Sequence, residues 1–172
     1  MSLTNPRIVK LSSIRVGAVG TTGIMGTTLT TVNYIVPGSA VVIFEAGTDT
    51  EFFVEEYEYP DISLTGKAVK RFEFATRKMS VANFLLAFGG STTASIWSAP
   101  TTLATEIVKS VELTSADYDG YHAKFNIVRA KLAPSANIPF TDTDTGQIKY
   151  AGKILQPTSA VPPLTIHIVA ET

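Results

Sequence analysis

The sequence predicts a mainly β protein, an antiparallel sandwich or barrel of about eight strands with one short helix. Threonine, valine and isoleucine make up 52 of the 172 residues, and these β-branched side chains suit a pleated sheet. Apolar and alternating runs are separated by Gly and Pro turns without a regular strand–helix alternation, which argues against a doubly wound parallel sheet. A chain of this length buries an adequate core as one domain, so we expect a single domain over residues 1–172.

Hydrophobic periodicity places the strands. The clearest alternation runs from Tyr121 to Val128, with apolar and polar residues in turn, as in a strand with one face in the core. The continuous apolar run Ala40–Phe44 predicts a strand covered on both faces. Pro134 and Pro139 are expected to interrupt strand structure after the alternating strand. The predicted strands cover residues 7–16, 28–36, 40–44, 51–59, 62–76, 107–113, 121–128, 147–155 and 164–170.

One segment predicts a helix, at about residues 80–88. Ser80 is a suitable N-cap, and Gly89 supplies the left-handed residue that ends many helices. The spacing i, i+3, i+4 and i+7 places four apolar side chains on one helical face. A helix this short is unstable alone, so this face must dock on the sheet. The expected docking anchors are Val81, Phe84, Leu85 and Phe88.

A glycine recurs at every third position between residues 17 and 26. Glycine loses more conformational entropy on ordering than any other residue, so we expect a mobile loop. No Gly-Lys-Ser/Thr sequence follows, which argues against a phosphate-binding loop. A plain flexible hairpin and a loop ordered against a second subunit or ring both remain open. The candidate loop residues are Gly17, Gly20, Gly23 and Gly26.

Charged residues form 17% of the chain, a low proportion, and the net charge is −1. We expect part of the surface to be hidden between copies, and no general attraction to nucleic acid. The one basic cluster is expected to pair charges between subunits, through Lys67, Lys70, Arg71 and Glu73. Glu56 and Glu58 share a face of the strand 51–59 and predict an acidic lumen or surface face.

The sequence contains no recognisable catalytic or metal-binding set, so we expect neither enzymatic activity nor a cofactor. It has no cysteine, and its two histidines, His122 and His167, lack metal-ligand spacing. Asp142 and Asp144 fit a polar turn better than a calcium loop. The apolar runs are too short to span a membrane, and the start of the sequence has no signal-peptide pattern, so no membrane partner is expected.

The segment from Lys67 to Thr76, followed by Ser80 to Gly90, resembles the major tail proteins of tailed bacteriophages. In that family an alternating strand precedes a short Asn-Leu-Ala-Leu-Ala-Leu-Gly-like helix, and Asn83-Phe84-Leu85-Leu86-Ala87-Phe88-Gly89 is similar to it. The strand after Tyr121 and the strand 147–155 are similar to the closing strands of the family. The Gly-rich stretch 17–26 has no match in it.

The resemblance implies a subunit that forms rings, six copies to a ring, stacked into a tail tube. The tube conducts DNA without specific binding and meets the tape-measure and tail terminator proteins. The protein would be made in the cytoplasm of the bacterial host and reside in the virion tail.

Other classes of function remain open. One is the tube subunit of a type VI or other contractile secretion system. Another is a carbohydrate- or host-binding module, with Trp97, Tyr57 or Tyr59 as its aromatic platform. The least favoured is a small hydrolase using His122 or His167.

Overall fold

The computed structural model describes residues 8, 10–47, 49–52, 62–65, 67–101, 106–141 and 144–170, and only the backbone of 49–52 and 62–65. It is mainly β with one short helix, as predicted. The elements are β1 Leu11–Gly17, β2 Leu29–Val32, β3 Val41–Glu45, β4 Asp49–Phe52, β5 Ile62–Thr65, β6 Val69–Thr76, α1 Val81–Phe88, β7 Ser91–Thr93, β8 Ile96–Ser98, β9 Ile107–Ser115, β10 Tyr121–Asn137, β11 Gln147–Ile154 and β12 Leu164–Ala170.

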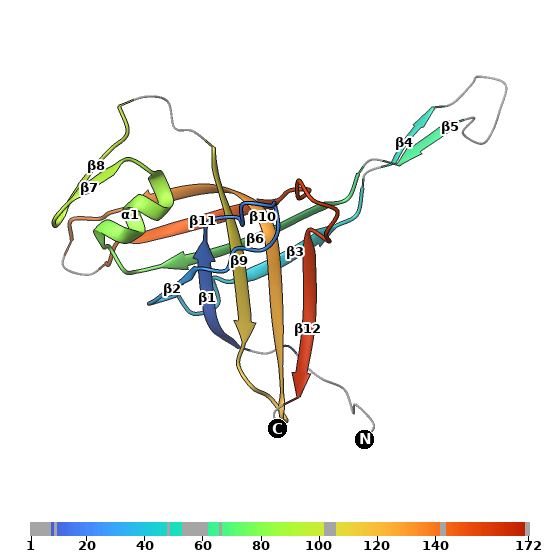
Figure 1. Ribbon diagram of the computed structural model, residues 1–172, viewed down its shortest axis with the longest axis horizontal. Coiled ribbons are helices and arrows are strands. Elements are labelled where there is room, and N and C mark those ends of the chain that lie inside the picture. The colour runs from blue at the N-terminus through green and yellow to red at the C-terminus, as the bar shows by residue number, and fades with distance from the viewer. Residues whose placement is uncertain are drawn as a thin grey trace.

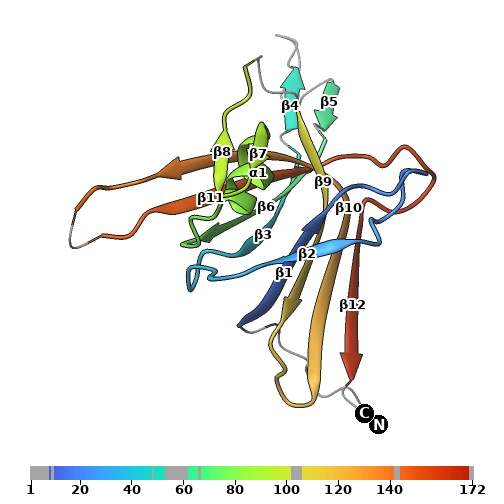
Figure 2. The ribbon, with the colours of Figure 1, turned by 60° about the vertical axis from the view of Figure 1, so that its left-hand side comes forward.

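Eight strands form one antiparallel sheet in the order β2-β1-β9-β10-β11-β6-β3, with β12 paired to β10 beside this path. Among the described strands, β2 and β3 at the two ends do not pair with each other, so the sheet is not a closed barrel. Two small hairpins, β4–β5 and β7–β8, stand apart from it. Figure 1 shows β4–β5 extending away from the body, and Figure 2 shows β10–β11 doing so in another direction.

The long strand β10 belongs to both halves of this sheet. Its first half, Tyr121–Ile127, pairs with β12, and its second half, Ala130–Asn137, pairs with β11. The register with β9 shifts between Ile127 and Ala130, which marks a β-bulge. A bulge bends a strand and increases its twist, so the two halves of the sheet face each other across a core.

A stack of aromatic rings fills the centre of the core. The rings of Phe72 and Phe74 on β6 lie 6.2 Å apart, and the ring of Phe74 lies 4.7 Å from that of Tyr150 on β11. The Tyr150 hydroxyl donates to the Asn83 carbonyl of α1, at 3.2 Å. Burial of this side chain raises the pKa of Tyr150 to about 12. Ile14, Val111, Ile127 and Ile148 close the same core.

The helix α1 has the predicted ends but docks through a different set of residues. The Asn83 N–H donates to the Ser80 side chain at 3.3 Å, and Gly89 caps the other end with φ 68°. Phe84 and Phe88 pack against the core as predicted. Leu85 is 39% exposed, so its assignment as an anchor is wrong; Ala87, which was not predicted, is fully buried. A small residue here brings the helix backbone close to the sheet.

The hairpin β7–β8 was not predicted, and it contains Trp97. The Trp97 ring lies 5.3 Å from that of Phe84 and 6.2 Å from that of Phe88, and its indole N–H donates to the Gly89 carbonyl at 2.8 Å. The hairpin therefore covers the apolar face of the helix. Gly90 has a positive φ of 89° and turns the chain into the hairpin directly after the helix.

Two further expectations about strands are wrong. The strand β3 is not covered on both faces, because it ends the sheet order and exposes Val41 and Phe44. Pro134 does not end the preceding strand: β10 continues through it to Asn137. Pairing with β9 stops at Leu132, so Pro134 has a ladder partner on the β11 side alone, and an edge tolerates a residue without an N–H.

Candidate assembly surface

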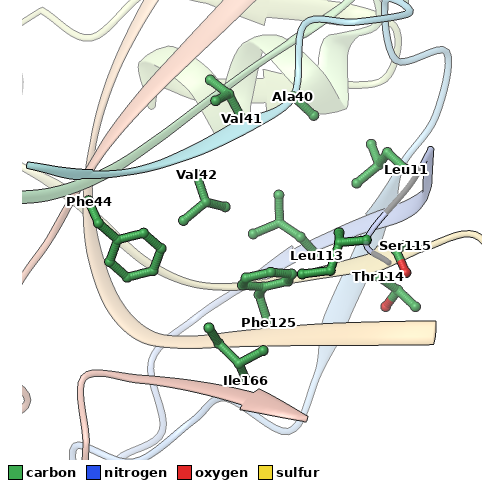
Figure 3. Close-up of a pocket in the computed structure, with 11 residues that line it drawn as sticks. Leu11, Ala40, Val41, Val42, Phe44, Leu113, Thr114, Ser115, Phe125 and Ile166 are labelled. Atoms are coloured by element: carbon green, nitrogen blue, oxygen red, sulfur yellow. The ribbon is translucent and has the colours of Figure 1, made fainter. Parts of the chain in front are cut away.

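The open end of the folded sheet contains an apolar cleft of about 380 Å³. Figure 3 shows Val42 and Phe44 of β3 facing Leu113, Phe125 and Ile166 across it. These five side chains come from β3, β9, β10 and β12, so the cleft lies where the two halves of the sheet diverge. Its lining is mainly apolar, with Thr114 and Ser115 as the polar members. The cleft offers a binding surface for apolar groups.

The strand β12 forms one margin of this end. Among the described strands its sole partner is β10, so its other edge presents free backbone N–H and C=O groups. Ile166, Ile168 and Val169 on this strand are exposed, and Ile168 is 53% exposed. Natural monomers usually protect such an edge with Pro, Lys or a bulge, and β12 has none of these within it.

The strand β3 forms the opposite margin. Phe44 is 52% exposed, and the Lys70 ammonium of β6 lies 5.9 Å from the centre of its ring. Arg71 of β6 pairs with Glu45 at 2.6 Å. This margin therefore combines apolar side chains with two cations of the predicted charged cluster.

A third exposed apolar feature lies at the end of the β10–β11 hairpin. Ile138 and Phe140 follow β10, and Phe140 is 96% exposed. Burying a large apolar side chain contributes about 1.5–3 kcal/mol, so a fully exposed Phe at the end of a projecting hairpin leaves that stabilisation unused within the subunit. Phe140 was not among the predicted contact residues, although a lone Phe among Pro139, Thr141 and Asp142 is its signal in the sequence.

The four predicted charged residues lie on this side of the chain but do not form one cluster. Lys67, Lys70, Arg71 and Glu73 are all exposed. Arg71 is held by Glu45 within the subunit, and Lys70 lies over Phe44. Their role between subunits stays a prediction. Glu56 and Glu58, the predicted acidic face, lie outside the described residues.

The Gly-rich stretch contacts its own chain. The Gly26 N–H donates to the Ser110 side chain at 3.0 Å, and the Ser159 hydroxyl donates to the Gly23 carbonyl at 2.9 Å. Within the loop, the Gly23 N–H donates to the Gly20 carbonyl at 2.8 Å. Gly26 is required because a Cβ there would collide with the Ala18 carbonyl. These bonds join the loop to its own chain. Its mobility and its contact with a second subunit or ring stay predictions.

A charge cluster around one mostly buried carboxylate lies on the outer side of the sheet. Glu112 of β9 is mostly buried and pairs with Arg15 of β1 at 3.3 Å and with Lys124 of β10 at 3.0 Å. Arg15 lies directly opposite Glu112, and Lys124 lies two residues before Asn126, the residue of β10 that is opposite Glu112. The sequence could not reveal this arrangement without the strand order. Each charge has a partner, so the cluster is a structural element of the sheet.

The other candidate side chains do not converge on a reactive site. His122 Nδ1 lies 3.1 Å from an Asp117 carboxylate oxygen, while His167 lies on β12 and is exposed. Within the described ranges, no group of three or more His, Asp or Glu side chains is placed to hold a metal ion. Trp97 packs on the helix, so most of its ring is not free to act as a sugar platform. Tyr57 and Tyr59 lie outside the described residues.

No helix in the described part of the chain is long and apolar enough to cross a membrane. No protein-family model matches the chain, and no curated protein matches it.

Proposed function

We propose that this chain is a structural subunit that assembles with copies of itself into rings, six to a ring, stacked as the tail tube of a bacteriophage. The observation that carries the proposal is the open end of the sheet. There, the unprotected edge of β12 and the exposed margin of β3 flank an apolar cleft. Such a surface is typical of one that is covered in an assembly.

Several features support contacts between copies rather than with a small ligand. The exposed apolar side chains lie on an edge strand, a sheet margin and a hairpin tip, which are separate places on the subunit. Two different surfaces that bind each other give a head-to-tail contact, and such contacts close into rings or continue as filaments. A tube subunit needs contacts of this kind in every copy.

The resemblance to tail proteins supplies the rest of the proposal. The tube conducts DNA, and a net charge of −1 suits a conduit that must release phosphate groups rather than bind them. The partners would be further copies of the chain and, by the same resemblance, the tape-measure and tail terminator proteins. The subunit would be made in the cytoplasm of the bacterial host and reside in the virion tail.

The test is assembly of the purified protein, followed by size-exclusion chromatography and negative-stain microscopy over a range of concentration and salt. Rings or tubes are expected. Ile168→Lys places a charge on the exposed edge strand and should leave a folded monomer. Thr92→Lys, on the exposed strand β7, is the matched control and should assemble normally. A wild-type protein that stays monomeric under all these conditions would overturn the proposed function.

A further inference from the structure

The hairpin tip and the apolar cleft fit each other in size. A cavity of about 150 Å³ lined by apolar side chains accepts a benzene molecule. The cleft measures about 380 Å³, so it accommodates the ring of Phe140 together with part of a second apolar side chain. Ile138, two residues before Phe140 and also exposed, provides that second group.

The hairpin tip and the cleft also fit in charge. Asp144 is exposed and lies four residues after Phe140, so the tip carries negative charge. At the cleft, Lys70 lies beside the ring of Phe44 and makes no ion pair among the described residues. Lys10, next to the lining residue Leu11, is a second exposed cation. A tip that enters the cleft would bring opposite charges together at its margin.

The tip of a hairpin cannot enter the cleft of its own subunit. Figure 2 shows the β10–β11 hairpin running away from the body. The residues that line the cleft come from β3, β12 and their neighbours, and none lies at the end of this hairpin. In the part of the chain that the structure describes, each subunit therefore presents one exposed tip and one open cleft. A contact between them is head-to-tail and leaves an unused tip and an unused cleft for the next copies.

We propose that Phe140 of one copy inserts into the cleft lined by Phe44, Leu113 and Phe125 of a second copy. The proposal rests on the proposed function, because it names the contact through which copies join. Burying one Phe side chain is equivalent to a change of about 10–150-fold in affinity. Phe140→Ala should therefore raise the concentration needed for half-maximal assembly by at least about tenfold.

The first experiment is a cross-link, which the absence of cysteine from the chain makes specific. Thr141→Cys places a thiol beside Phe140, and Val41→Cys places one on β3 at the margin of the cleft. Oxidation of the double variant should produce a ladder of covalent multimers. Each single variant should give dimers at most. Thr92→Cys combined with Val41→Cys is the matched control and should give no ladder. A ladder in the control equal to that of the double variant would contradict the proposal.

The second experiment removes the ring and leaves the thiols. Phe140→Ala in the double-cysteine variant should abolish the ladder, whereas Ile96→Ala, which truncates an exposed apolar side chain on β8, should not. The thermal midpoints of both should match that of the parent, because neither side chain is buried. Assembly into rings with the ladder unchanged in Phe140→Ala would overturn this contact but not the proposed function. A failure of the wild type to assemble would overturn the proposed function.

The tests must also exclude the start of the same chain as the occupant of the cleft, since Ile8 lines it. Ser2→Cys combined with Val41→Cys tests this occupant. A disulfide within one chain, detected as faster migration on a non-reducing gel, would assign the cleft to the subunit's own N-terminal residues and overturn the proposal. Migration as an uncross-linked monomer is expected.

Discussion

Large apolar side chains are buried at one end of the sheet, the packed end beneath α1, and remain partly exposed at the other, the open end. At the packed end, Phe72, Phe74 and Tyr150 stack beneath α1 and are almost fully buried. At the open end, Phe44 of β3 and Ile166 of β12 face a cleft and remain about half exposed. The core is therefore fully covered at the packed end of the sheet and open to solvent at the other end. The difference predicts that stability depends mainly on the packed end and can be separated from the proposed assembly at the open end.

The largest expected effect tests that separation directly. Phe74→Ala removes the middle ring of the stack and should lower the free energy of unfolding by about 3–5 kcal/mol. Phe44→Ala, at the open end, should lower it by less than about 1 kcal/mol, because the ring is already half exposed. Urea unfolding of both variants checks this. Similar losses in the two variants would mean that the two ends contribute equally to the fold.

A medium effect concerns pH at the packed end. The pKa of Tyr150 is about 12 in the folded protein and about 10 in an unfolded chain. The folded state therefore favours the neutral phenol. The pKa difference contributes about 2–3 kcal/mol to the free energy of unfolding; this contribution is complete below pH 10 and is lost as the pH rises towards 12.

Urea midpoints of the wild type and Tyr150→Phe at pH 8, 10 and 11.5 measure this effect. The wild type should lose more stability than the variant between pH 10 and 11.5. At pH 8 the free energy of unfolding of the variant should be lower by about 1 kcal/mol, because the variant lacks the hydrogen bond to Asn83. Parallel pH profiles would show that the Tyr150 phenol is solvated in the folded protein.

The smallest expected effect lies on the surface of the packed half. Glu106 accepts a hydrogen bond from the Lys131 ammonium, and this bond and the positive charge lower the pKa of Glu106. Lys131→Met should return the pKa of Glu106 towards its usual value, as measured by NMR titration. The unfolding midpoint at neutral pH should scarcely change, because an exposed ion pair contributes little. A large loss of stability would show that this ion pair contributes substantially to the stability of the packed half, contrary to the prediction.

Local signals were sufficient for most elements of the fold. Ser80 and Gly89 fixed the ends of the helix, and the spacing of Phe72 and Phe74 predicted their strand, because capping and alternation depend on near neighbours. The exposed Leu85 and the uncovered face of β3 could not be predicted this way. Both depend on which strand lies opposite, and the strand order is a non-local property.

The candidate assembly surface was predicted only in outline. Low charge suggested surface hidden between copies, but the cleft needs the bend at the bulge between Ile127 and Ala130, which has no sequence signal. Phe140 was passed over because it follows Pro139 in a stretch expected to be a turn. The structure also places Lys70 beside Phe44, a neighbour that the sequence could not identify without the pairing of β3 with β6.

The strand order also determines when, during synthesis, each strand gains its pairing partners. Ile14 of β1 pairs with Leu113 of β9, 99 residues later in the chain. At about 5–20 residues per second, a ribosome takes roughly 5–20 s to deliver that partner. Throughout this time Ile14 and Val16 can pair with β2 but lack their partners on β9, which favours off-pathway contacts between nascent chains. Completion of the sheet must therefore wait for the synthesis of β9, and expression at reduced temperature with abundant chaperone should raise the soluble yield.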